Sequence, residues 1–185
     1  MLQELWKFIK KPNYTEDENN DFNYRLRILI KLTAVSIVAS IILGLTISAL
    51  ESLFTLDLGK HAIDDFFEKY PTIYLFIGAV VIAPVLEELI FRGPMVLFKN
   101  KPYFPVIFYI LTLLFGFYHI TNFEITTTIL LMSLLLVSPQ LFVGSVLGFI
   151  RVRFGLLWSI GLHALYNLLL VGPIILLKVL NIPLE

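Results

Sequence analysis

Two adjacent carboxylates and an arginine interrupt a stretch that is otherwise apolar from residue 70 to residue 98. These residues are Glu87, Glu88 and Arg92, and ionisable groups in so apolar a setting are costly enough to be functional candidates. Each residue of a helix advances by about 100°, so Glu88 shares a face with Arg92 whereas Glu87 points roughly 100° away. We therefore expect Arg92 to neutralise Glu88 and Glu87 to find its partners on other elements.

Three further polar side chains interrupt other apolar runs. They are His119, His163 and Asn167, the last two being four residues apart. Counted from the nearest polar loop at 1.5 Å per residue, Glu87 lies about 20 Å deep, His119 about 24 Å and His163 about 15 Å, which agrees within a turn or two. Taken alone, each of these side chains is equally well explained as an ordinary hydrogen bond between neighbouring helices. Together, a carboxylate, two imidazoles and an amide can activate a water and stabilise an oxyanion.

The composition indicates that a membrane surrounds these groups. The chain is 58% hydrophobic, has a mean hydropathy of +0.86 and carries no net charge, whereas soluble domains are roughly 45–50% apolar. Cysteine is absent, which excludes disulfides, thiolate metal sites and a cysteine nucleophile. The lipid bilayer is the expected partner, no nucleic acid is expected, and no oligomeric state is predicted.

Five apolar runs are long enough to cross a bilayer. The sequence thus predicts an all-α, polytopic transmembrane helix bundle, with a kink at Gly93 and Pro94 and a break at Pro139. Gly144 and Gly148 have the spacing of a close helix contact. The predicted spans are residues 28–50, 72–98, 106–121, 125–150 and 156–180.

The amino-terminal region is predicted to lie outside the bilayer core. Leu2, Leu5, Trp6 and Ile9 share one helical face opposite several lysines, a pattern typical of a short surface helix; a frayed terminal helix is the alternative. Residues 12–23 are polar and aperiodic, so residues 1–27 are expected to form this helix and a flexible linker, ahead of a transmembrane domain at 28–185. Residues 51–69 are predicted to form a polar loop with a surface helix at about 63–70 and a solvated His61.

The distribution of basic residues predicts an orientation. Eleven of the fourteen Lys and Arg flank the loops on the amino-terminal side of the bundle, and basic residues near span ends favour the cytoplasmic side. We expect an integral protein of a prokaryotic plasma (inner) membrane, with its amino terminus in the cytoplasm and its carboxyl terminus outside.

Three short motifs resemble those of a known family. EELIFR (residues 87–92), FGFYH (115–119) and HALYN (163–167) are similar to the EExxxR, FxxxH and HxxxN motifs of the CAAX-processing and bacteriocin-processing (CPBP, or Abi) intramembrane peptidases, which include the type II CAAX prenyl endopeptidases. The resemblance covers a core at about residues 73–170. It implies a membrane endopeptidase that cleaves membrane-associated or lipidated proteins or peptides.

The positions of the motif residues suggest a role for each of them in peptide hydrolysis. Glu87 is expected to be the general base and His119 to orient the same water, with His163 and Asn167 stabilising the oxyanion. In the alternative, Glu87, His119 and His163 hold a zinc ion that activates the water, although HExxH is absent. The catalytic set is completed by Glu88, and Arg92 and Phe115 are predicted to support the structure.

Two non-catalytic functions remain open at this stage. Some relatives are tied to bacteriocin immunity, so the chain could be a scaffold or immunity protein that binds a partner in the membrane. A small transporter would also place ionisable groups at mid-membrane, but the first, third and fourth spans offer few polar residues to line a path.

Overall fold

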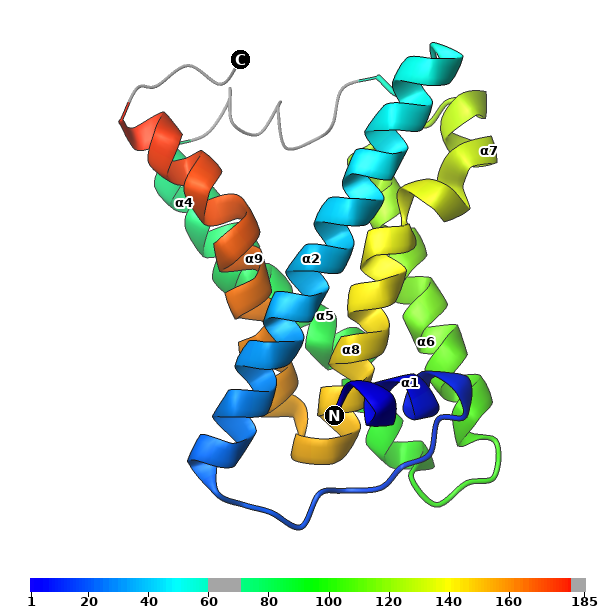
Figure 1. The fold of residues 1–185 in the computed structure, drawn as a ribbon, viewed down its shortest axis with the longest axis vertical. Helices are drawn as coiled ribbons and strands as arrows, with labels where there is room; N and C mark the ends of the chain where they lie inside the picture. Colours follow the sequence, from blue (N-terminus) through cyan, green and yellow to red (C-terminus); the bar gives the residue numbers. More distant parts are fainter. Residues whose placement is uncertain (60–70, 181–185) are drawn as a thin grey trace.

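The computed structural model describes residues 1–59 and 71–180, and its secondary-structure elements are all helices (Figure 1). Five stretches in these ranges are long and apolar enough to cross a membrane: α2 (Phe22–Phe54), α4 to η2 (Thr72–Phe98), α6 to η3 (Phe104–Asn122), α7 to α8 (Thr127–Phe154) and α9 (Leu156–Val179). The predicted class, an all-α bundle of five spans, is confirmed, and the protein is an integral membrane protein. The predicted surface helix at 63–70 and His61 lie outside the described residues.

The second span is a succession of four helical segments. An α-helical turn, α4 (Thr72–Phe76), leads into the π-helix η1 (Ile77–Ile82), then into α5 (Ala83–Phe91) and the 3₁₀-helix η2 (Gly93–Phe98). Pro84 lacks a backbone N–H and cannot donate to the carbonyl four residues before it, which favours a wider turn. The kink predicted at Gly93 and Pro94 is the start of η2, whereas the π-helix was not predicted.

The core is built around α8 (Ser138–Phe154), which contacts α2, α6 (Phe104–Tyr118) and α9. A Cβ atom added to Gly144 would come within 2.9 Å of the Phe115 ring, and one added to Gly148 within 2.6 Å of the Phe108 ring. These two glycines therefore let aromatic rings of α6 lie directly on the backbone of α8, and the predicted close helix contact is confirmed.

Single residues mark both ends of α8. It is separated from α7 (Thr127–Leu136) at Val137, two residues before Pro139, so the predicted break is present. At its other end, Gly155 alone joins it to α9, with a φ of 98°. Residues with a side chain rarely adopt this left-handed backbone, which makes the glycine necessary for so tight a turn.

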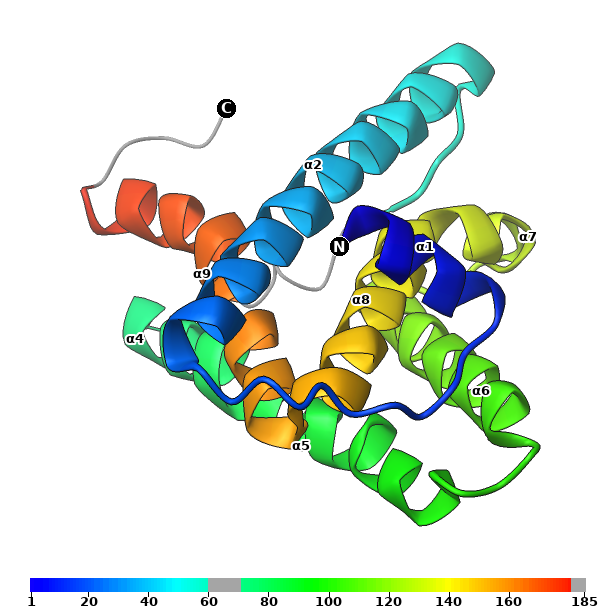
Figure 2. The same ribbon diagram turned by 60° about the horizontal axis from the view of Figure 1, so that its bottom comes forward.

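The helix α1 (Leu2–Lys10) lies across α8 near the lower end of the bundle (Figures 1 and 2). Leu5 and Phe8 are buried, and the Phe8 ring centroid lies 5.0 Å from that of Phe108. Leu2 and Trp6, by contrast, are 54% and 59% exposed. The predicted surface helix is thus packed on the protein through part of its apolar face and is not frayed.

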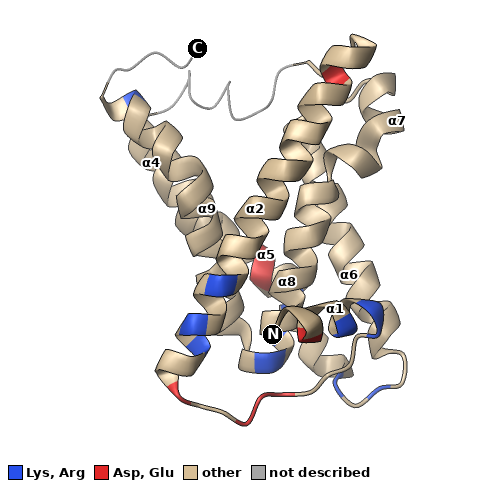
Figure 3. Ribbon diagram, viewed as in Figure 1, with Lys and Arg blue, Asp and Glu red and all other residues tan. Residues whose placement is uncertain are grey.

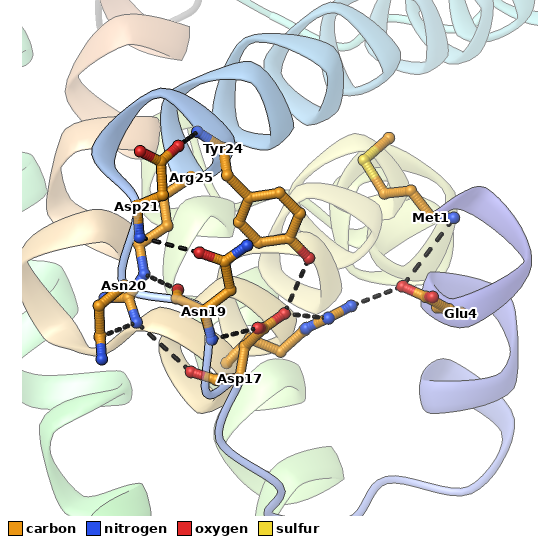
Figure 4. Close-up of polar contacts among 9 residues, drawn as sticks. Met1, Glu4, Asp17, Asn19, Asn20, Asp21, Tyr24 and Arg25 are labelled. Carbon is orange, nitrogen blue, oxygen red and sulfur yellow. Dashed lines mark hydrogen bonds and ion pairs between the residues drawn. The ribbon is translucent and has the colours of Figure 1, made fainter.

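The polar segment that follows α1 is fastened to the end of α8. The Arg153 guanidinium pairs with Glu4 at 2.6 Å and with Asp17, and the backbone N–H of Asp17 donates to the carbonyl of Arg153 at 3.0 Å. Tyr24 donates its hydroxyl hydrogen to the same aspartate (Figure 4). The segment predicted as a flexible linker is therefore held by specific bonds, and α2 begins at Phe22, capped by Asp21, ahead of the predicted boundary at residue 28.

These bonds change the acidity of both carboxyl groups. The hydrogen bond from Arg153 lowers the pKa of Glu4 below its ordinary value. Partial burial opposes ionisation of Asp17, but the backbone N–H of Asn19 and the Arg153 guanidinium outweigh that effect and lower its pKa. Both carboxylates are stabilised in the charged form when the segment is in place.

The charged residues are distributed unequally along the bundle. Lys and Arg gather at the end where α1 lies, and acidic residues of α5 lie midway along the spans (Figure 3). The chain starts at that end, and α9 ends at the opposite one (Figure 1). The functional candidates therefore lie well inside the apolar part of the bundle.

Candidate active site

Glu88 is the centre of a buried polar network. Its side chain and that of Arg92 are both fully buried, with Oε1 of the glutamate 3.2 Å from Nη1 of the arginine. The same Oε1 lies 3.1 Å from Nδ1 of His163, and Ser159 donates its hydroxyl hydrogen to Oε2. The predicted pairing of Glu88 with Arg92 is confirmed. Ser159 was not predicted, although it lies four residues before His163 and hence on the same face of α9.

Arg92 connects this network to α6 and α8. Its Nη2 donates to the Gly144 carbonyl at 3.2 Å, and its guanidinium carbon lies 3.8 Å from the centroid of the Phe115 ring. Arg151 of α8 donates from Nε to the Arg92 carbonyl at 3.1 Å. Because the guanidinium is planar and stacks on an aromatic face, Phe115 provides a platform for it; the supporting roles of the two residues stay a prediction.

Glu87 points away from this network towards α6 and α9. Its Oε2 lies 3.9 Å from Nε2 of His119 and 3.8 Å from Nε2 of His163. The oxygen is buried and has no hydrogen-bond partner, and both distances are too long for a direct hydrogen bond. The glutamate thus meets two other elements, as its direction on the helix predicted.

The second nitrogen of each imidazole determines what faces Glu87. Nδ1 of His119 lies 2.9 Å from the Phe115 carbonyl, which can only accept, so this nitrogen carries the hydrogen. Nδ1 of His163 faces the Glu88 carboxylate and donates to it in the same way. In the neutral imidazoles, both Nε2 atoms are therefore acceptors that flank Glu87 Oε2, and protonation turns an Nε2 into a donor.

Asn167 lies one turn beyond His163 on α9. Its Nδ2 donates to the Ala79 carbonyl at 2.8 Å, and Ala79 belongs to the π-helix η1. The structure therefore brings together Glu87, Glu88, His119 and His163, and it places Asn167 beside them as a link to the π-helical turn. An amide nitrogen carries two hydrogens, so one donor of Asn167 is not used by this bond.

The three predicted zinc ligands do not form a ready metal site. Among the described residues, no group of three His, Asp or Glu side chains has an arrangement that could hold a metal ion. A carboxylate with two imidazoles is a suitable donor set for zinc, but the ligand atoms must converge to about 2.0–2.2 Å from the ion. The zinc alternative for Glu87, His119 and His163 therefore stays a prediction, and no catalytic step is assigned to the ion.

A cavity of the described residues lies away from the motif side chains. It measures about 450 Å³ and opens between the segment after α1 and the end of α8, where Tyr14, Asp17, Arg25 and Arg153 are among its lining residues. The site is defined by the convergence of its side chains.

Comparison with known proteins agrees with this geometry. Residues 69–169, more than half of the chain, match the sequence model of the family described as type II CAAX prenyl endopeptidase Rce1-like. The chain belongs to this family. The matched range contains the three motifs at residues 87–92, 115–119 and 163–167 and leaves out α1 and α2. No curated protein and no solved structure matches the chain. The Rce1-like family is a family of proteases, so a hydrolase is supported at that level.

Proposed function

We propose that this protein is an intramembrane endopeptidase that hydrolyses peptide bonds of membrane-associated or lipidated proteins or peptides. One observation carries the proposal: Glu87 Oε2 lacks a hydrogen-bond partner and lies 3.8 and 3.9 Å from two imidazole nitrogens. A water molecule fits such a separation and donates its two hydrogens to Glu87 Oε2 and to Nε2 of His119, which leaves Nε2 of His163 for the oxyanion. The proposed chemistry is attack of this water on the substrate carbonyl.

In the first step, Glu87 removes a proton from the water while the water oxygen bonds to the carbonyl carbon. His119 holds the water through Nε2, since its Nδ1 hydrogen is committed to the Phe115 carbonyl. The carbonyl oxygen becomes an oxyanion, and stabilising it requires donors in a setting without bulk water. His163 in its charged form donates from Nε2, and the second amide hydrogen of Asn167 is a further donor.

In the second step, Glu87 returns the proton to the amide nitrogen as the C–N bond breaks, which releases a carboxylic acid and an amine. Glu88 acts as a positioning residue throughout. Its carboxylate holds Nδ1 of His163 at 3.1 Å, so that Nε2 faces the reaction, and it stabilises the imidazolium that donates to the oxyanion. The pairing with Arg92 keeps Glu88 itself ionised at this depth.

We also propose an orientation with the amino terminus in the cytoplasm of a prokaryotic cell, from the basic residues at the α1 end of the bundle (Figure 3). Cleavage would then occur within the plasma membrane. Basic residues near the ends of spans favour the cytoplasmic side, so their excess at the α1 end supports this orientation.

The proposal is tested by incubating purified protein in detergent or vesicles with a peptide library, in lipidated and unlipidated forms, and detecting cleavage by mass spectrometry. Glu87→Gln should lower turnover by about 10²–10⁴, the usual contribution of a positioned base, with little loss of folded protein. Glu124→Gln makes the same chemical change at an exposed carboxylate outside the motifs and should leave turnover unchanged. No cleavage by the wild-type protein, or full activity of Glu87→Gln, would refute the proposal and favour a scaffold, an immunity protein or a transporter.

A further inference from the structure

Several buried polar side-chain atoms of the described residues have no hydrogen-bond partner. Most of them are hydroxyls or nitrogens of Arg92, and a hydroxyl can turn towards a carbonyl of its own helix. Only two are oxygens that can accept but never donate, Glu87 Oε2 and Gln140 Oε1. The hydroxyls in this group belong to Ser36, Thr112 and Ser138. The proposed water accounts for Glu87 Oε2, whereas Gln140 Oε1 has no donor in the structure.

The packing of α6 against α8 places Gln140 beside the active site. Gly148 of α8 meets Phe108 of α6, and Gly144 meets Phe115, so residue numbers fall along α8 as they rise along α6 and the two helices run antiparallel. One turn from Gly144 along α8 is Gln140, and one turn after Phe115, at the start of η3 (His119–Asn122), is His119, which puts the two residues at a similar level of the bundle. At this level the backbones are close, because a Cβ on Gly116 would lie 3.7 Å from the backbone nitrogen of Leu141.

A substrate of an intramembrane peptidase brings the missing donors. In lipid, backbone N–H and C=O groups are paired within a helix, and a segment that unwinds for hydrolysis leaves them without partners and without water. The enzyme must therefore supply acceptors for the exposed N–H groups near the bond to be cut. Gln140 can be such an acceptor, because its side chain is half-buried and its Oε1 has no donor.

We propose that Gln140 binds the substrate backbone, its Oε1 accepting a hydrogen bond from a peptide N–H next to the scissile bond. The proposal rests on the proposed function and adds a residue outside the three motifs. It identifies the ligand as an unwound, extended peptide segment, because a helical segment has no free N–H to offer at this position.

The effect of Gln140 on stability distinguishes a role in substrate binding from a role in packing. A buried polar group without a partner destabilises the folded protein, so Gln140→Leu, which keeps the size, should raise the melting temperature by about 2–6 °C while raising KM. Thr112→Val is the matched control: it removes another unpaired buried polar atom from α6 and should raise or preserve stability with unchanged kinetics. A lower melting temperature for Gln140→Leu would overturn the proposal, because it would show a structural role.

Ester substitution in the substrate tests the bond itself. In the best-cleaved peptide of the library, each backbone N–H flanking the scissile bond is replaced in turn by an ester oxygen, which removes the donor. One such ester should raise KM of the wild-type enzyme about 3- to 10-fold, the effect of one hydrogen bond, with little change in kcat. Gln140→Leu should raise KM by a similar factor for the normal peptide and show no further loss with that ester, since both changes remove one contact.

Independent, multiplying effects of every ester and of Gln140→Leu would refute the contact while leaving the proposed function standing. Unchanged kinetics of Gln140→Leu would refute it in the same way. No cleavage by the wild-type protein would refute the proposed function and, with it, the role of Gln140.

Discussion

Replacing Glu88 by glutamine removes the negative charge from a fully buried ion pair. The change keeps the size of the side chain, and the glutamine amide can still bond to Ser159 or His163, but the Arg92 guanidinium 3.2 Å away is left without a counter-charge. Breaking such a pair typically costs about 3–5 kcal/mol, a large part of the 5–15 kcal/mol that usually stabilises a folded domain. We expect Glu88→Gln to lower the folded yield and to lower the melting temperature by about 10 °C.

A second substitution separates the charge from the other contacts of the pair. Glu88→Gln/Arg92→Met removes the stranded charge, but it also removes the hydrogen bond to the Gly144 carbonyl and the stacking on Phe115. These two contacts are worth about 1–2 kcal/mol each, so the double variant should recover only part of the stability. Its turnover should stay low even when it is folded, because a glutamine at position 88 has no charge with which to stabilise the imidazolium of His163.

The comparison is made by thermal unfolding in detergent alongside peptide cleavage, with Glu124→Gln as the control for the loss of an exposed carboxylate. Two results would contradict the reasoning: a Glu88→Gln protein as stable as the wild type, or a double variant no more stable than the single one. If Glu87→Gln were instead the unstable variant, and Glu88→Gln folded normally but were inactive, the base would be Glu88.

Three further predictions concern topology, metal and the amino-terminal segment. With no native cysteine, a cysteine replacing Asn19 should be protected from an impermeant reagent added outside and one replacing Asp57 should be labelled; the reverse pattern would refute the orientation. We expect protein shown by elemental analysis to be metal-free to keep full activity, whereas stoichiometric zinc and inactivation by a chelator would support the zinc alternative. Because the pKa values of the two carboxyl groups paired with Arg153 are lowered, their stabilisation is complete above their ordinary pKa values and is lost as the pH falls below about 4. The protection factors of residues 2–21, which correct hydrogen exchange for its intrinsic dependence on pH, should then fall on acidification in the wild type and already be low at neutral pH in Arg153→Gln; wild-type protection factors independent of pH would contradict this.

Patterns local in the sequence predicted much of the fold and part of the site. The five spans follow from the length of their apolar runs, because a bilayer of fixed thickness selects helices of that length. The pairing of Glu88 with Arg92 follows from a spacing of four residues within one helix, and the direction of Glu87 follows from the same geometry. The three motifs identified the family because residue type and spacing were sufficient for each of them.

The tertiary structure decided how these helices meet, which no local pattern contains. The bond from Ser159 to Glu88, the position of His163 between two carboxylates and the anchoring of Asn167 on a π-helical carbonyl all join elements far apart in the chain. The polar composition after α1 predicted a flexible linker, whereas its bonds to Arg153 hold it in place. Composition indicates how much apolar surface a segment can bury. It does not give the partner of a polar group, because that partner depends on which helix face packs against the group when the helices assemble.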